Sequence, residues 1–318
     1  MKKTINDLIA LVALATISTA HGALVLEYNA SDLALTNDAT GVAWVPSTYT
    51  TLMDTTLQAG SSVITPTSAY FSRAIQNANT DAITSFNSGS FAPSTSADFS
   101  FEVWVKLSNL TGDHVLFETG GGTTGAGLTI ADDTLAFTVN NAGQIGSLTN
   151  TLSALPGDFV QVLGVIDFDA GGDSLSLYVN GALVDTASGL TVGGWAGANA
   201  GQLGGTAGNI AAPVGFPSNS PDSFDGEMAL ARFYDSALLA SEVNTLYTNI
   251  TAGIPPSSPL PSPYQHLDAT VPGSVTVNGS DEVSQWTDQS GNGNNAVDSN
   301  GSPVPVSYTH LTLPTIQL

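Results

Sequence analysis

The stretch DSLSLYVNGALVDTA, residues 173–187, places apolar side chains at alternate positions on both sides of an Asn-Gly pair. Alternation with a period of two is typical of a β-strand that buries one face. Asn-Gly is the preferred pair for a two-residue type I′ turn, because both turn positions need a positive φ. The stretch therefore predicts a β-hairpin that turns at the Asn-Gly pair, with Leu175, Leu177 and Val179 on one face.

Other short runs have the same character. Strand-like runs occur at 128–139, 159–168 and 174–186, and Gly, Asn, Asp, Ser and Pro separate such runs along the chain. Only 236–250 has helical spacing, with Ser241 as its expected N-cap. Many antiparallel strands with one short C-terminal helix predict an all-β fold, an antiparallel β-sandwich.

The chain divides into segments of different composition. A Lys-Lys start, a compact apolar run and small residues are typical of a secretory leader. A later stretch rich in proline predicts a stiff spacer between two domains. The predicted segments are a signal peptide at 1–23, a β-sandwich domain at 24–250, a Pro-rich linker at 251–263, an incomplete second domain at 264–305 and a non-native tail at 306–318.

The segment after the linker repeats the opening of the first domain. "EYNASDL" followed by "VAW", within 27–44, corresponds to "HLDATVPG" followed by "VSQW", within 266–286. Such repetition indicates a tandem arrangement. The second copy is too short for a sandwich, so we interpret it as the incomplete start of a similar domain. "VSYTHLTLPTIQL" at 306–318 breaks in style from the residues before it and is interpreted as a non-native tail, with a natural edge strand as the alternative.

The charge of the chain limits its partners. There are 5 basic and 27 acidic residues, so the net charge is −22. Nucleic acids and anionic membranes bind proteins through basic patches, so neither is an expected partner. No stretch after the leader has the ~18 apolar residues that a membrane helix needs. Together with the leader, these features predict a secreted protein, extracellular or at the cell surface. The absence of cysteine excludes disulfides and thiol catalysis.

Five segments occur in an order that is typical of one family. They are "FSFEVWVKL" (99–107), "HVLFETGG" (114–121), "GLTIADDTLAFTV" (127–139), "LSLYVNGALV" (175–184) and "FDGEMALARFYDSALLASEVNTLY" (224–247). Together they resemble the laminin-G-like jelly roll of the concanavalin A-like lectin/glucanase superfamily. The resemblance implies a jelly-roll sandwich over residues 24–250. By analogy alone, it also implies a binding or adhesion module whose partner is a glycan or another extracellular ligand.

The residues for catalysis are sparse. Glucanases of this fold carry Glu-x-Asp-x-x-Glu on one strand, because cleavage needs two carboxylates beside the sugar bond. None of the six glutamates begins that motif, and His114 is the only histidine between leader and linker. We expect His114 at a strand start on the surface, and we expect no enzyme. The alternatives are an ancillary or spacer domain of a larger exported polysaccharide-active enzyme and, less favoured, a glycoside hydrolase with carboxylates from distant strands.

Two tryptophans are candidate platforms for a sugar ring. Trp195 lies in a glycine-rich stretch, and Trp104 shares a strand face with Glu102 and Lys106. Only one face of that strand can belong to the main core. For both tryptophans the alternative is a ring packed under a loop.

Calcium is the metal ion that the composition favours, because the chain offers oxygen ligands and little else. Asp167, Asp169 and Asp173 surround a glycine-rich turn and can provide three carboxylates within seven residues. The alternative is an acidic hairpin tip, since Asp and Gly are ordinary turn residues.

Overall fold

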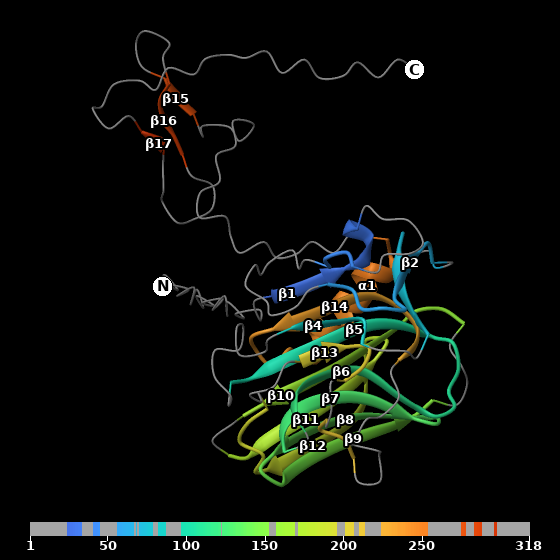
Figure 1. The fold of residues 1–318 in the computed structure, drawn as a ribbon. Coiled ribbons are helices and arrows are strands. Elements are labelled where there is room, and N and C mark those ends of the chain that lie inside the picture. Colours follow the sequence, from blue (N-terminus) through green and yellow to red (C-terminus); the bar gives the residue numbers. More distant parts are fainter. Residues whose placement is uncertain are drawn as a thin grey trace, which may run out of the picture. The chain divides into compact units, whose positions relative to one another are not determined.

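The structure is a computed structural model of the 318-residue chain (Figure 1). It describes residues 24–33, 41–44, 56–66, 68, 70–78, 82–86, 97–121, 123–152, 157–168, 171–195, 201–206, 210–213, 224–253, 275–277, 283–287 and 296–297. The predicted leader and tail, and the linker beyond residue 253, lie outside the described residues. The chain divides into two units, 1–256 and 257–318.

The first unit consists of two antiparallel sheets (Figure 1). The eight-stranded sheet has the order β12-β11-β10-β5-β14-β3-β2, and β1 also pairs with β14. Its strands are β1 (Leu24–Asn29), β2 (Ser62–Ile64), β3 (Ala74–Ala78), β5 (Phe99–Leu107), β10 (Val160–Asp167), β11 (Asp173–Val179), β12 (Ala182–Leu190) and β14 (Asp225–Tyr234). A single turn of 3-10 helix, Ala30–Asp32, follows β1.

The six-stranded sheet has the order β4-β13-β6-β7-β8-β9. Its strands are β4 (Thr84–Phe86), β6 (Asp113–Gly121), β7 (Thr124–Ala131), β8 (Thr134–Asn141), β9 (Gln144–Thr151) and β13 (Gly201–Leu203). The run at 128–139 thus forms parts of two strands, joined by a turn at Asp132 and Asp133. The predicted antiparallel β-sandwich is confirmed.

The hairpin at 173–187 forms as its alternation predicts. β11 and β12 are antiparallel neighbours, and φ is 51° at Asn180 and 76° at Gly181, as a type I′ turn requires. Leu175 and Leu177 are buried, and Val179 packs against the same main core. The alternating pattern therefore identified both the turn and the buried face.

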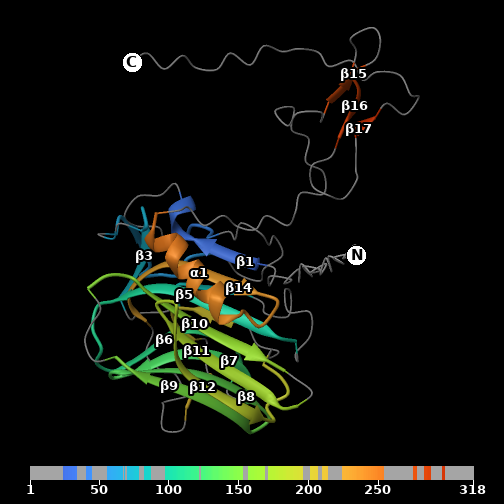
Figure 2. The ribbon, with the colours of Figure 1, turned by 180° about the vertical axis from the view of Figure 1, so that it is seen from behind.

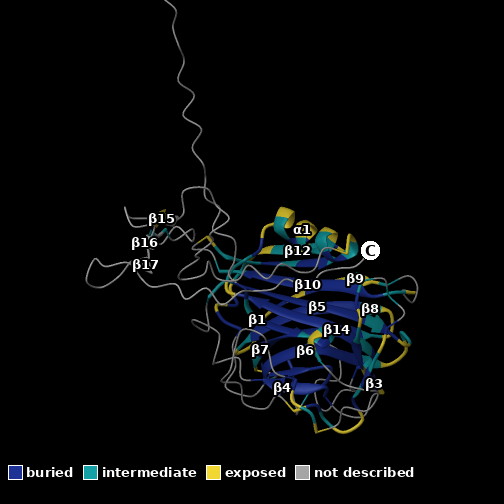
Figure 3. Ribbon diagram, turned by 90° about the horizontal axis from the view of Figure 1, so that it is seen from above, coloured by how far each residue is buried: buried dark blue, intermediate teal, exposed yellow. Residues whose placement is uncertain are grey.

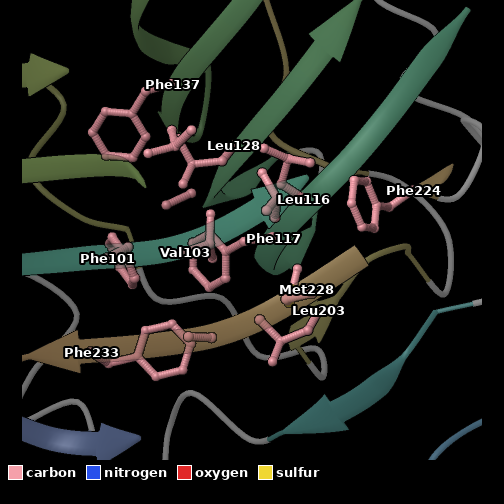
Figure 4. Packing of buried hydrophobic residues seen from close by; sticks show 14 of the residues in the cluster. Phe101, Val103, Leu116, Phe117, Leu128, Phe137, Leu203, Phe224, Met228 and Phe233 are labelled. Carbon is pink, nitrogen blue, oxygen red and sulfur yellow. The ribbon is translucent and has the colours of Figure 1, made fainter. Parts of the chain in front are cut away.

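The main core fills the space between the two sheets. Figure 4 shows Phe101 and Phe233 of the eight-stranded sheet close to Phe117 of the six-stranded sheet. The centroids of the Phe101 and Phe117 rings are 4.6 Å apart, and those of Phe117 and Phe233 are 5.4 Å apart. Contacts of this kind add to the burial of apolar area that holds the sheets together.

One helix, α1 (Ala240–Thr251), packs on the outer face of the eight-stranded sheet (Figure 2). Val243 and Ile250 are buried, whereas the side away from the sheet is exposed (Figure 3). The predicted cap at Ser241 is wrong, because the helix begins after Leu239. The Glu242 carboxylate accepts a hydrogen bond from the Leu239 N–H at 2.7 Å, which satisfies a donor that the helix leaves free.

The second unit contains three described strands, which form an antiparallel sheet in the order β15-β16-β17. They are β15 (Val275–Val277), β16 (Val283–Trp286) and β17 (Ala296–Val297). Its similarity to the first domain stays a prediction. Among the residues that the structure describes, no helix has the length and apolar character to cross a membrane.

Candidate functional site

Trp195 lies in the main core and not on the surface. Its ring is fully buried, 4.5 Å from the ring of Phe99 and 5.0 Å from that of Phe101, measured between centroids. The indole N–H donates to the Ala97 carbonyl at 2.9 Å, so its polar atom is satisfied inside the protein. The expected exposed platform is therefore not present at Trp195. The glycines before it let the chain turn inward, with φ of +66° at Gly193.

Trp104 is buried on the opposite face of β5. The ring of Tyr247 from α1 is stacked on it, with centroids 5.9 Å apart and planes 8° apart, and Phe71 packs against its edge. Phe99 and Phe101 occupy the face of β5 that belongs to the main core. This agrees with the expectation that only one face of this strand belongs to that core. Because α1 covers the other face, Trp104 also presents no open ring to a ligand.

A buried polar network lies beside Trp104. Glu102 accepts hydrogen bonds from Trp104 Nε1 at 2.8 Å, Gln161 Nε2 at 2.7 Å and the Tyr234 hydroxyl at 2.8 Å. Burial raises the pKa of Tyr234, and the Glu102 charge raises it further, so the phenol stays a donor. The carboxylate is thus surrounded by donors of its own protein, and this network has a structural role.

The network continues in both directions. Arg232 is ion-paired with Glu27 at 2.6 Å and with Glu102 at 3.7 Å, which joins β14 to β1 and β5. Gln161 Oε1 accepts a hydrogen bond from the Gly181 N–H at 2.9 Å, and Gln161 N–H donates to Asn180 Oδ1 at 3.0 Å. The Asn-Gly turn is therefore anchored to the sheet.

The predicted calcium ligands are only partly described. Asp169 lies outside the described residues, Asp167 ends β10, and Asp173 begins β11. Asp173 Oδ2 accepts a hydrogen bond from the Gly193 N–H at 2.7 Å, so it already stabilises the start of the hairpin. No group of three metal-ligating side chains occurs within the described ranges. The calcium hypothesis stays a prediction.

A line of polar and small residues crosses the outer face of the six-stranded sheet. Phe117, Leu128 and Phe137 point into the core, so the alternate positions of their strands face outward (Figure 4). The pairing register places six outward residues side by side, from one edge strand to the other. This polar row consists of Ser85, Gln202, Glu118, Gly127, Thr138 and Ser147.

Glu118 is the one ionisable member of the polar row. It is 1% exposed, and burial raises its pKa well above the usual range of a glutamate. Within the described part of the chain, Glu118 Oε2, the neighbouring Gln202 Oε1 and Thr129 Oγ1 of the same face have no hydrogen-bond partner. Buried polar atoms without partners are rare and costly, and perturbed carboxyls cluster at functional sites. We therefore take this face as the candidate site.

A short segment, Ile210–Pro213, covers the middle of the polar row. A Cβ atom added at Gly127 would lie only 2.4 Å from the Ala211 carbonyl oxygen, so the row has room for this segment only because Gly127 lacks a side chain. Ile210 packs in a small apolar cluster with Val115. At its β9 end the row is open to solvent, because Ser147 is exposed.

The sequence pattern alone did not identify this site. The expectation for Glu118 concerned only a three-carboxylate motif on one strand, although an isolated glutamate within "HVLFETGG" was itself a signal. The sequence also predicted His114 on the surface, whereas the residue is buried at the start of β6. The His114 prediction is wrong because the start of β14 lies against it, and the Asp225 N–H donates to its Nδ1 at 3.4 Å.

Comparison with known proteins identifies the fold. The family model of the concanavalin A-like lectin/glucanases superfamily, of laminin G type, matches residues 77–244, which is more than half of the chain. No curated protein matches the sequence.

Among solved structures, the chain is similar to domain 4 of AbnA, a GH43 extracellular arabinanase from Geobacillus stearothermophilus, in complex with arabinotriose. The identity is 16%, the TM-score 0.48, and the match covers 71% of this chain and 98% of that chain. It is also similar to the binding domain of botulinum neurotoxin serotype G, with 14% identity and a TM-score of 0.51. That match covers 77% of this chain and 53% of the other, so this chain spans about half of the neurotoxin domain.

Proposed function

The chain belongs to the concanavalin A-like lectin/glucanases superfamily, and from this we propose that its first unit binds carbohydrate through the polar row, without cleaving it. The proposal concerns the outer face of the six-stranded sheet around Glu118. It extends to a secreted protein, because the predicted leader precedes the domain directly.

The observation that carries the proposal is the pair of buried oxygen atoms Glu118 Oε2 and Gln202 Oε1, neither of which has a partner among the described residues. The two residues are directly opposite each other on β6 and β13. A sugar offers many hydroxyl donors at the spacing of neighbouring side chains. A buried polar group without a hydrogen-bond partner costs about 1–3 kcal/mol of stability. A ligand that hydrogen-bonds to these two oxygen atoms removes that cost.

The absence of cleavage is proposed from the distribution of carboxylates. Both retaining and inverting glycosidases use a pair of carboxyl groups across the sugar bond. In the polar row Glu118 is the single carboxyl group, and the chain lacks the Glu-x-Asp-x-x-Glu arrangement of glucanases. One buried carboxyl group is sufficient to accept hydrogen bonds but not to provide both acid and nucleophile.

A second candidate function is an ancillary domain of a larger exported polysaccharide-active enzyme. It is favoured by the Pro-rich segment and by the separate sheet of β15 and β16 that follows it in the sequence. This order of segments is typical of a multidomain protein. In that case the first unit would hold the enzyme on its polymer or would act as a spacer.

The test is a glycan array with the full chain, followed by calorimetry on the best ligand. We expect binding in the wild type and an affinity on the order of tenfold lower in Glu118→Gln, because the amide replaces one acceptor oxygen by a donor. Asp133→Asn, in an exposed turn of the same sheet, is the matched control and should bind as the wild type does. Absence of glycan binding, or unchanged affinity in Glu118→Gln, would contradict the proposal. Release of reducing sugar from the bound polymer would overturn the non-catalytic assignment.

A further inference from the structure

The segment Ile210–Pro213 occupies the part of the polar row where a ligand would lie. We propose that the ligand of this site is a neutral glycan, which binds by taking the place of this segment. The inference rests on the proposed carbohydrate function and adds the charge class of the ligand and the competition with the protein's own chain.

The segment crosses the row at its centre. Gly127 pairs with Glu118 on one side and with Thr138 on the other, and the Ala211 carbonyl fills the space above Gly127. A carbonyl oxygen is an acceptor, so it cannot satisfy the unpartnered amide oxygen of Gln202. The segment therefore covers the row sterically but does not match it chemically.

The segment is held by packing and not by hydrogen bonds, with Ile210 and Ala211 each 1% exposed. In the described part of the chain, Ile210, Ala211, Ala212 and Pro213 make no hydrogen bond. Ile210 is its one large apolar side chain, and it packs with Val115 and partly buried alanines. A segment attached only by packing can be replaced by a ligand that makes hydrogen bonds to the same face, because its affinity for the face competes directly with that of the ligand.

The charge of the site selects against acidic ligands. After the predicted leader the chain has three basic residues, Arg73, Lys106 and Arg232. Lys106 and Arg232 lie on the eight-stranded sheet, and Arg73 directly precedes β3 of that sheet. The described strands of the six-stranded sheet have no Lys or Arg, whereas the row contains a carboxyl group. A uronate or sulfate would meet no Lys or Arg side chain of these strands and would bring a further negative charge beside a carboxyl group.

The first experiment measures competition. Ile210→Ser removes the apolar anchor and leaves every residue of the polar row unchanged. We expect it to bind neutral glycans, represented by laminarin, xylan and arabinan, about tenfold more tightly, since the apparent affinity rises with the fraction of uncovered sites. Leu183→Ser, an exposed leucine on β12 of the other sheet, is the control and should leave the affinity unchanged. Unchanged or weaker binding in Ile210→Ser would overturn the competition.

A second variant tests the same contact without removing apolar area. Gly127→Ala places a methyl group where the Ala211 carbonyl lies, so we expect faster hydrogen–deuterium exchange at the amides of residues 210–212 in the unliganded full chain. Gly157→Ala, where a Cβ meets no atom within 4 Å, is its control and should exchange like the wild type. Unchanged exchange in Gly127→Ala would show that the contact between Gly127 and Ala211 does not hold the segment in place. That result would overturn the proposal, whatever the glycan affinity of the variant.

The charge class is tested on the same proteins with polygalacturonate as the acidic probe. We expect at least tenfold weaker binding than to the best neutral polymer at low salt. Equal binding would overturn the neutral assignment and leave carbohydrate binding intact. If the wild type and both variants bind no glycan at all, the proposed function itself fails; if the wild type binds and the variants do not differ from it, only the competition fails.

Discussion

Gly181 has two separate reasons to be glycine, and a pair of substitutions separates them. Its φ is +76°, and an added Cβ would lie 2.9 Å from the Cβ of Tyr247 in α1. Gly189, in β12, has a similar φ of +70°, but an added Cβ there meets no atom within 4 Å. Gly189→Ala therefore measures the backbone cost alone, whereas Gly181→Ala measures the backbone cost together with the contact to the helix.

The expected magnitudes follow from these two geometries. A left-handed backbone costs a residue with a Cβ about 1–2 kcal/mol relative to glycine, so Gly189→Ala should lower the free energy of unfolding by about that amount. Overpacking adds about 1–3 kcal/mol, because Tyr247 is itself held by its stacking on Trp104 and cannot move freely. Gly181→Ala should therefore lower the free energy of unfolding by about 2–5 kcal/mol.

The assay is urea unfolding of the full chain, followed by tryptophan fluorescence. We expect the midpoint of the first unit's transition to fall in both variants, with a larger fall in Gly181→Ala, and equal slopes throughout, since the buried surface is the same. Equal midpoints in the two variants would refute the reasoning, because the close approach of the hairpin to α1 would then contribute nothing.

Four other substitutions test charged or ionisable side chains. Arg232→Met leaves two glutamates buried without their cation and should lower the free energy of unfolding by about 3–5 kcal/mol in urea, whereas Lys106→Met, whose ion pair is partly exposed, should cost below about 1 kcal/mol. For Glu118, whose native pKa is raised, the folded state keeps a proton that the unfolded chain releases. The wild type should lose stability relative to Glu118→Gln as the pH rises above about 4, and urea midpoints between pH 4 and 8 that stay parallel would contradict this. Asp173→Ala should lower the thermal midpoint by removing a charged hydrogen bond worth about 1.5–3 kcal/mol, and a chelator should not change the midpoint of the wild type; a fall on chelation would favour the calcium hypothesis instead.

Local patterns were sufficient for the strands and their turns. The alternation in 173–187 predicted β11, β12 and the buried leucines, because the side-chain period of a strand depends on the backbone alone. The Asn-Gly pair predicted the type I′ turn for an equally local reason, since few residues accept two consecutive positive φ angles. Five such segments in order were enough to predict the family, which the match over residues 77–244 bears out.

Local patterns did not predict what covers the strand faces that point away from the main core. Alternation distinguishes the two faces of β5, but it cannot say that α1 covers the face of Trp104, or that Trp195 enters the core between the sheets. These outcomes depend on packing between segments that are far apart in the chain. The polar row has the same origin: Gln202 and Glu118 are neighbours only because β13 pairs with β6, and this register is set by long-range packing of the sandwich and not by any local pattern.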